Sequence, residues 1–273
     1  SDVCSSDLLF DEIGKRARDV LQEGYSDLAT IRICSKRNKD LNVVCLAQSG
    51  IGNPFFSSLT ADFNINDIFT MKKLQVASSG VISADLNAQN LVKNTVFRFE
   101  GLKDINIRGI QKAALGVEVS AKKVGLVASV DFATQKYITA CTYYFRSLVI
   151  GAKLSGQSNQ IPLFDFAASY SHSDMTCSVI AYDLFSRVDM DLCYRIDKHM
   201  SVATSCAVDV DSGKCPDFEL GLKFEPDRYT TLRAKISDKG ILSGCFKVAA
   251  NERMTMYGSL SVNAIDLNAG ANK

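Results

Sequence analysis

After residue 24, apolar and polar residues alternate one by one along the chain, and this alternation restricts the fold more than any other feature. The clearest run covers residues 188–196, where every second position is Val, Met, Leu, Tyr or Ile and the polar positions include Asp189, Asp191 and Arg195. Successive side chains of a β-strand point to opposite faces, so a period of two predicts strands with one apolar and one polar face. The same pattern occurs at residues 115–120, 124–132, 148–155, 218–225 and 231–236.

Segments rich in turn-forming residues separate these runs at short and regular spacing. They are residues 197–199, 211–213, 225–227, 237–240 and 250–253. A repeat of roughly ten alternating residues and a short turn is typical of an antiparallel up-and-down meander. No linker or change in composition interrupts the pattern after residue 25, so the sequence predicts one β domain over residues 25–273.

The polar face of these strands indicates where the water lies. A closed barrel with this many strands has an interior too wide for side chains to fill, so its inward face would be polar. We therefore predict an all-β protein, a large transmembrane antiparallel β-barrel whose apolar face meets lipid. A soluble sandwich, which would bury the apolar faces between two sheets, is the alternative.

Residues 9–23 form the one segment with a helical period. Their apolar side chains recur three or four positions apart, and charged residues occupy the opposite side. Asp7 suits the N-cap, and Gly24 suits the position just after the last turn. We predict an N-terminal segment, residues 1–24, with an amphipathic α-helix that lies on a membrane or lines a water-filled lumen.

The composition excludes several classes of function. Lys and Arg total 31 against 30 Asp and Glu, which gives a net charge of +1. This balance argues against non-specific electrostatic binding of nucleic acid. The nine Cys form no CxxC pair and none lies at zinc-finger spacing from His172 or His199, so we expect mostly reduced thiols, no metal and no cofactor. Nucleophile, Walker A and Rossmann motifs are absent, so the sequence does not predict an enzyme.

Residues 9–21, with the sequence LFDEIGKRARDVL, resemble the N-terminal helix of the mitochondrial porins, the voltage-dependent anion channels. Gly101, Leu102 and Lys103 are similar to the family's Gly-Leu-Lys element, which is associated with nucleotide contact, and residues 231–270 are similar to its final hairpins. The resemblance implies a barrel of 19 strands with the helix inside the pore and with the first and last strands paired in parallel. The family would continue past Lys273 for about one strand of 9–11 residues, so we expect about 18–19 strands, in a barrel with one strand fewer than the family or with an exposed edge.

The resemblance also implies a function. It predicts a voltage-gated, weakly anion-selective channel for ATP, ADP, phosphate and other small solutes across the mitochondrial outer membrane. The implied partners are membrane lipid, other copies of the chain, hexokinase-type kinases and apoptosis regulators. A protein-import barrel of the same superfamily, which should lack the motif at residues 13–21, and a soluble all-β binding protein are the alternatives.

Selectivity would come from charges that face the lumen. The cations that we predict there are Lys15, Arg16 and Arg18 on the helix and Lys123, Lys153, Arg195, Lys223, Arg233, Lys235 and Lys247 on the wall. The same face carries Asp131, Asp189, Asp191, Asp209, Glu219 and Glu225. The wall charges nearly cancel and predict only a weak preference for anions, so the cations of a helix inside the lumen would matter most.

Overall fold

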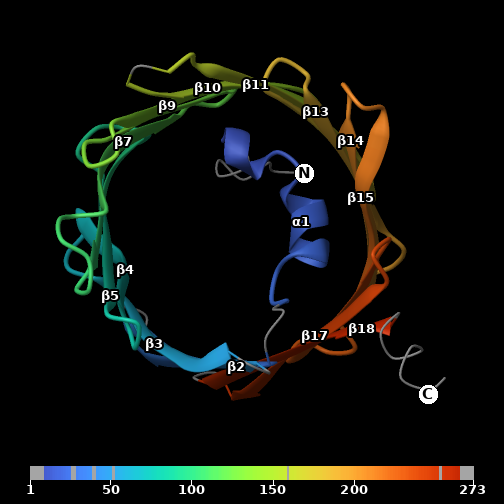
Figure 1. Ribbon diagram of the computed structural model, residues 1–273, viewed down its shortest axis with the longest axis horizontal. Helices are drawn as coiled ribbons and strands as arrows, with labels where there is room; N and C mark the ends of the chain where they lie inside the picture. The colour runs from blue at the N-terminus through green and yellow to red at the C-terminus, as the bar shows by residue number, and fades with distance from the viewer. Residues whose placement is uncertain are drawn as a thin grey trace.

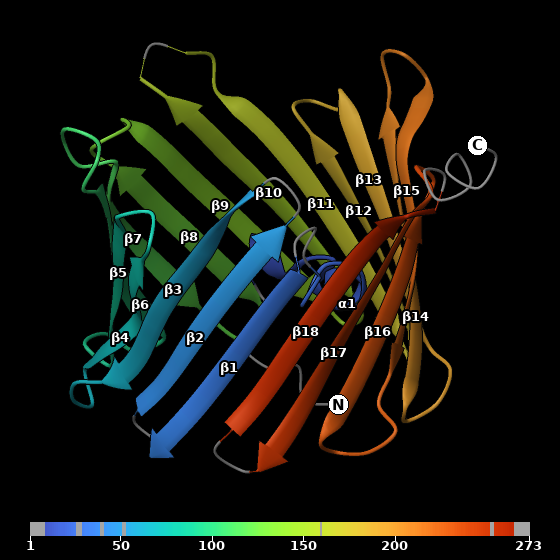
Figure 2. The same cartoon turned by 60° about the horizontal axis from the view of Figure 1, so that its bottom comes forward.

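The computed structural model describes residues 9–25, 29–38, 41–50, 53–158, 160–251 and 254–264, and these residues form a closed barrel of 18 strands (Figure 1). The strands are β1 (Ala29–Asn38), β2 (Leu41–Gly50), β3 (Asn53–Asn64), β4 (Phe69–Ala77), β5 (Val81–Gln89), β6 (Thr95–Asp104), β7 (Lys112–Ser120), β8 (Val124–Asp131), β9 (Lys136–Phe145), β10 (Leu148–Gln157), β11 (Leu163–His172), β12 (Met175–Tyr182), β13 (Arg187–Arg195), β14 (Met200–Asp209), β15 (Lys214–Phe224), β16 (Thr230–Ser237), β17 (Ile241–Asn251) and β18 (Met254–Asn263). They are inclined to the barrel axis, as closure of a sheet requires (Figure 2). The predicted all-β barrel is confirmed.

Each strand pairs with its neighbours in the chain, and β1 closes the barrel against β18. The resemblance implies 19 strands and a parallel closing pair, whereas β1 and β18 are antiparallel, with Arg32 opposite Tyr257. The strand number explains this difference. Successive strands alternate in direction, so with an even number of strands the first and the last run in opposite directions. Residues 265–273 lie outside the described part of the chain.

The apolar face of the strands points outward, as the alternation predicts. On β13, Met190, Leu192 and Tyr194 are 46%, 39% and 50% exposed. Asp191 and Cys193, which lie between them, are 8% and 9% exposed because the N-terminal segment covers them from inside the lumen. The apolar faces are not buried between two sheets, so the alternative of a soluble sandwich is wrong.

The N-terminal segment lies inside the barrel as two short helical pieces (Figure 1). A 3₁₀ turn, η2 (Phe10–Glu12), precedes the α-helix α1 (Lys15–Leu21). The predicted amphipathic helix inside the pore is confirmed, but it is shorter than the helical period of residues 9–23, because Ile13 is extended and Gly14 has a φ of 77°, which breaks the helical hydrogen-bond ladder. Asp7, the predicted N-cap, lies outside the described residues. Among the described residues, no helix has the length and apolar character needed to cross a bilayer.

The inner wall makes room for the helix with small residues. A Cβ atom on Gly221 would lie 2.7 Å from Leu21 Cδ2, and one on Gly151 would lie 2.8 Å from Phe10 Cδ2. Glycine at these two positions therefore allows the helical pieces to approach the strand backbone.

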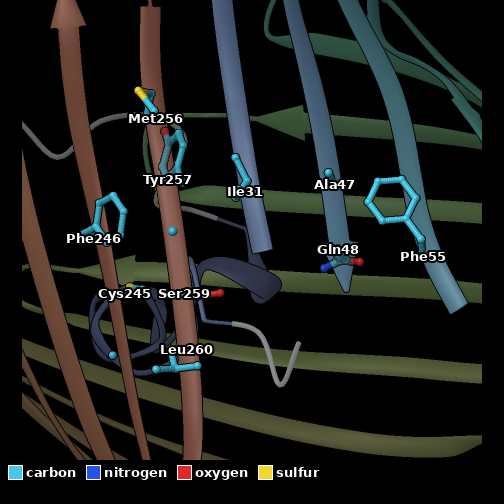
Figure 3. A pocket seen from close by; sticks show the side chains of 12 residues that line it. Ile31, Ala47, Gln48, Phe55, Cys245, Phe246, Met256, Tyr257, Ser259 and Leu260 are labelled. Atoms are coloured by element: carbon cyan, nitrogen blue, oxygen red, sulfur yellow. The ribbon is translucent and has the colours of Figure 1, made fainter. Parts of the chain in front are cut away.

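The outer wall also has a hollow, close to the seam where the barrel closes (Figure 3). This cavity of about 640 Å³ crosses β17, β18, β1, β2 and β3. Its outward-facing lining includes Ile31, Phe55, Phe246, Met256 and Leu260. An apolar hollow of this kind suits the hydrocarbon region of a bilayer.

Candidate functional site

The lumen and the helix docked on its wall form the candidate functional site. Phe10 and Ile13 pack against Ala140, Ala167 and Ile180 on β9, β11 and β12. Further along, the apolar side of α1 packs against Cys193 on β13 and Ala203 on β14. These contacts bury the apolar stripe that the helical period predicts, so the polar side of α1 faces the open lumen.

Polar contacts hold both ends of the docked segment. At its C-terminal end, the Arg233 guanidinium of β16 donates to the Glu23 carbonyl at 3.0 Å and pairs with the Glu23 carboxylate at 2.5 Å. At its N-terminal end, Lys153 Nζ of β10 lies 3.8 Å from Asp11 Oδ1 and 5.6 Å from the centre of the Phe10 ring. Docking therefore combines apolar burial with ion pairs at both ends.

The three helix cations occupy different environments. Lys15 pairs with Glu12 at 2.5 Å. Arg16 is exposed and donates from Nη1 to Thr176 Oγ1 of β12 at 3.0 Å. Arg18 donates to the Asp11 carbonyl, which joins α1 to the preceding 3₁₀ turn.

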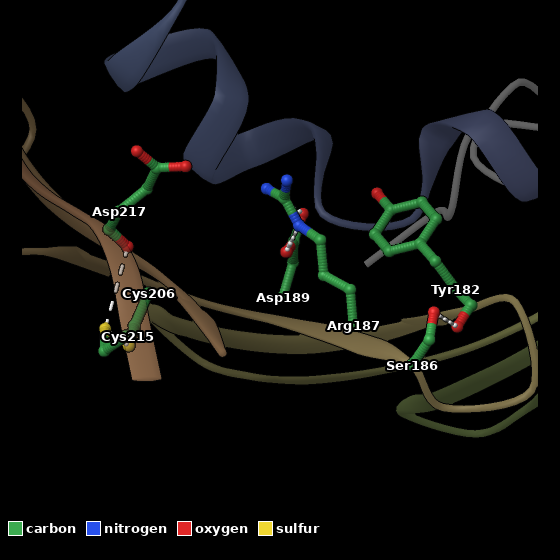
Figure 4. A network of polar contacts seen from close by, with 7 residues as sticks. All are labelled: Tyr182, Ser186, Arg187, Asp189, Cys206, Cys215 and Asp217. Atoms are coloured by element: carbon green, nitrogen blue, oxygen red, sulfur yellow. Dashed lines mark hydrogen bonds and ion pairs between the residues drawn. The ribbon is translucent and has the colours of Figure 1, made fainter. Parts of the chain in front are cut away.

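Several wall cations are neutralised by acids on neighbouring positions. Lys223 pairs with Glu225 at 2.9 Å, and Lys235 pairs with Glu219 at 2.9 Å. Lys247 lies over the Tyr257 ring, 5.5 Å from its centre. Figure 4 shows a further pair on the lumen side of β13, where Arg187 Nε donates to Asp189 Oδ1 at 2.8 Å. The wall is therefore rich in charge but locally compensated.

Arg16, Arg195 and Lys223 surround a cavity of about 180 Å³ between α1 and the wall. Asp19 and Asp174 also line it, so the cavity holds three cations and two acids. Among the described residues, Arg16 and Arg195 form no ion pair within 4 Å. This is the place where the structure brings a predicted helix cation and two predicted wall cations together. Because Lys223 is paired with Glu225, Arg16 and Arg195 supply the cationic groups beside the hydroxyl groups here, and guanidinium groups of this kind suit a phosphate or carboxylate group.

Burial raises the pKa of the Asp19 carboxyl above its usual range, and the neighbouring Glu23 raises it further. The positive charges of Lys15 and Arg233 lower the pKa of Asp19, but the loss of hydration on burial has the larger effect. The carboxylate of Asp19 therefore opposes docking of the helix, and its protonation favours docking.

The structure separates the remaining predicted residues from this cavity. Lys123 is exposed in the turn between β7 and β8. In the Gly101-Leu102-Lys103 element at the end of β6, Lys103 Nζ donates to the Ile107 carbonyl at 2.8 Å and also to the Gly109 carbonyl. These hydrogen bonds from Lys103 stabilise the loop that follows β6.

A charged cluster that the sequence does not single out lies on the wall at β6 and β7. Arg98 pairs with Glu118 at 2.6 Å, and Lys112 pairs with Glu100. With Asp11, these residues line a cavity of about 480 Å³. The alternation of Phe and charged residues from Phe97 to Glu100 is the signal that could have placed Arg98 and Glu100 in the lumen.

Comparisons with known proteins agree with the architecture. A Rhodopseudomonas blastica porin triple mutant has a TM-score of 0.50 and 10% identity, over 86% of this chain and 99% of that one. A structure described as "Asymmetric conductivity of engineered proteins" has a TM-score of 0.51 and 10% identity over the same shares of the two chains. At this identity both likenesses show the fold alone. A search among curated proteins finds no match in sequence. The model of the eukaryotic porin family matches residues 8–273, so the chain belongs to the eukaryotic porin family.

Proposed function

We propose that this eukaryotic porin is a voltage-gated, weakly anion-selective channel that passes ATP, ADP, phosphate and other small solutes across the mitochondrial outer membrane. The observation that carries the proposal is the helix inside the lumen, docked by apolar contacts and placed so that Arg16 stands beside Arg195 and Lys223. The mitochondrial location, homo-oligomers, hexokinase-type partners and apoptosis regulators are proposals that rest on the resemblance. So does the division of the chain at residue 24, and so does nucleotide contact at Gly101, Leu102 and Lys103.

The wall charges support a weak preference for anions. Lys223 and Lys235 each have an acid at 2.9 Å, so their fields partly cancel in the lumen. Arg16 and Arg195 add positive charge close to the helix without an ion pair of their own within the described residues. A permeating anion would meet an attractive potential at one side of the pore, and a cation would still pass along the rest of the wide lumen.

The charge of the helix supports dependence on voltage. Lys15, Arg16 and Arg18 against Asp19 give α1 (Lys15–Leu21) two net positive charges. One charge that crosses the full membrane field at 100 mV contributes about 2.3 kcal/mol, so two charges that cross half of the field would contribute about the same. That energy is comparable with the loss of one buried apolar contact, so moderate voltages could shift the docking equilibrium.

The test is the current through a planar lipid bilayer that contains the refolded chain. We expect discrete steps, a reversal potential in a salt gradient that indicates weak anion preference, and closure to lower-conductance states at both polarities. The double variant Arg16→Gln, Arg195→Gln should move the reversal potential toward cation preference. The matched control is Lys122→Gln, Lys198→Gln, which also removes two positive charges but at exposed positions in the turns after β7 and β13. Anion preference that is unchanged in the double variant would contradict the assigned selectivity, and the absence of conductance from inserted protein would refute the channel.

A further inference from the structure

Two cysteines on neighbouring strands lie side by side near one end of the barrel (Figure 4). Cys206 is on β14 and Cys215 is on β15, and their Sγ atoms are 2.9 Å apart. Both are free thiols. Among the described residues, no other two cysteine sulfurs are within hydrogen-bond distance of each other.

A local irregularity of the sheet brings the two thiols together. Ala207 is opposite Asp217, but the next paired residues are Asp209 and Lys214, so β15 contributes one more residue than β14 between these pairs. This bulge places Cys215 beside Cys206, whose direct partner in the ladder is Phe218. Pro216, which has no N–H to donate, lies inside the bulge, where a ladder hydrogen bond is not needed.

The pair is open to reagents from outside the lumen. Figure 4 shows the side chain of Asp217 directed toward the helix, with the two sulfurs on the other side of the strand. Cys215 is exposed, and it lies two residues from Gly213 in the turn, which is about 7 Å along a strand. Cys193 and Cys245 are instead buried in the lumen wall, against the docked N-terminal segment.

We propose that Cys206 and Cys215 form a redox-active dithiol that a small disulfide of the glutathione type oxidises to an intramolecular disulfide. The deprotonated thiol of Cys215 attacks one sulfur of the small disulfide, forms a mixed disulfide and releases one small thiolate. The deprotonated thiol of Cys206 then attacks Cys215 Sγ, forms the Cys206–Cys215 bond and releases the second small thiolate. The two protons lost by the cysteines end on the two released thiols, and the two electrons pass to the small disulfide.

The bond would close a small covalent ring around the turn between β14 and β15. Two strands that end in a turn can separate there without disturbing the rest of the barrel, because the ends of a sheet open at the lowest cost. A covalent link between Cys206 and Cys215 prevents that separation, and reduction by excess small thiol restores it. The hairpin of β14 and β15 would thus be more rigid in an oxidising solution, where the disulfide forms, and more flexible in a reducing one.

The chain can report this bond without any engineered label. Tryptic cleavage after Lys198, Lys214 and Lys223 leaves Cys206 alone on one peptide and Cys215 alone on the next. We would incubate the full chain, folded in detergent, in glutathione buffers with an increasing oxidised fraction, block free thiols by alkylation, digest, and identify linked peptides by mass spectrometry. We expect the peptide joined through Cys206 and Cys215 to exceed any other cysteine-linked peptide by about tenfold, because the second step is intramolecular.

Three variants and one denatured sample complete the test. Cys206→Ser and Cys215→Ser should each abolish the joined peptide, and Cys141→Ser, at an exposed position on β9, should leave it unchanged. Excess small thiol should remove the joined peptide, and the tenfold preference should disappear in denaturant. The proposal is overturned if the folded wild-type chain gives Cys206 and Cys215 only as alkylated or separately glutathionylated peptides, or if other cysteine pairs link equally well. The readout is chemical, so its failure would leave the channel proposal untouched.

Discussion

Replacement of Leu21 by Ala should release the helix from the wall in a measurable fraction of molecules. Leu21 is 2% exposed, and it fits over Gly221 on β15. The lumen is aqueous, so the side chain transfers between water and an apolar contact when the helix docks. At about 0.8 kcal/mol for each buried CH₂, the truncation removes roughly 2.5 kcal/mol from docking. This corresponds to an increase of about 60-fold in the ratio of undocked to docked helix.

Limited proteolysis measures that ratio. The bonds after Arg16 and Arg18 are tryptic sites on α1, and cleavage there follows the undocked population when docking is fast relative to cleavage. We expect Leu21→Ala to raise the rate of these two cuts by about 60-fold. Gln22→Ala, at the exposed neighbouring position, should leave the rate within about twofold of wild type. A rate for Leu21→Ala within about threefold of the Gln22→Ala rate would refute the assignment of the docking energy to this contact.

The same cleavage assay checks two further predictions. Gly221→Ala should weaken docking, because its Cβ would lie 2.7 Å from Leu21 Cδ2. Gly244→Ala is the control and should leave docking unchanged, because the nearest atom to its Cβ would be 3.9 Å away. Equal cleavage rates for the two variants would contradict the close fit of Leu21 over Gly221. Burial and Glu23 raise the pKa of Asp19 in the docked state, so protonation of Asp19 makes docking more favourable at low pH, and this contribution to the docking free energy is lost as the pH rises through the raised pKa. Asp19→Asn should therefore dock more tightly than wild type at neutral pH, and the ratio of wild-type to variant cleavage rates should fall toward one on acidification; a constant ratio would contradict this.

The strands and their faces could be predicted from the sequence because a period of two is a local property. The alternation at residues 188–196 directly gives the outward side of Met190 and Leu192 and the inward side of Asp191, and the structure confirms both. The same pattern suits a barrel with a polar interior but also a sandwich with buried apolar faces, and the pairing of β1 with β18 decides for the barrel. The apolar stripe of residues 9–23 likewise predicts which side of the helix is buried.

Other features depend on contacts between distant segments, which a single strand pattern does not contain. The pairing of Lys235 with Glu219 requires the register between β15 and β16, and register is set by the whole sheet. The break of the helix at Gly14 follows from the wall, because Gly14 packs against Asp191 and a side chain on Gly14 would approach Asp191 Oδ2 to 2.9 Å. The bulge that brings Cys206 to Cys215 is likewise a property of two strands together.

Docking and selectivity are coupled through Arg16. In the docked state Arg16 donates to Thr176 and shares a cavity with Arg195 and Lys223, so the cations are concentrated at one side of the pore. When the helix leaves the wall, Arg16 leaves with it and the contacts that bury Asp191 beside α1 are lost. Undocking also separates Arg233 and Lys153 of the wall from Glu23 and Asp11, so the wall gains two unpaired cations together with the newly hydrated carboxylate of Asp191. These changes oppose the loss of Arg16, and their difference sets the selectivity of the undocked pore. We therefore expect any change that undocks the helix to change the reversal potential, so that reversal potential and cleavage rate vary together across variants. Variants in which the helix is released at unchanged reversal potential would contradict a coupling between docking and selectivity.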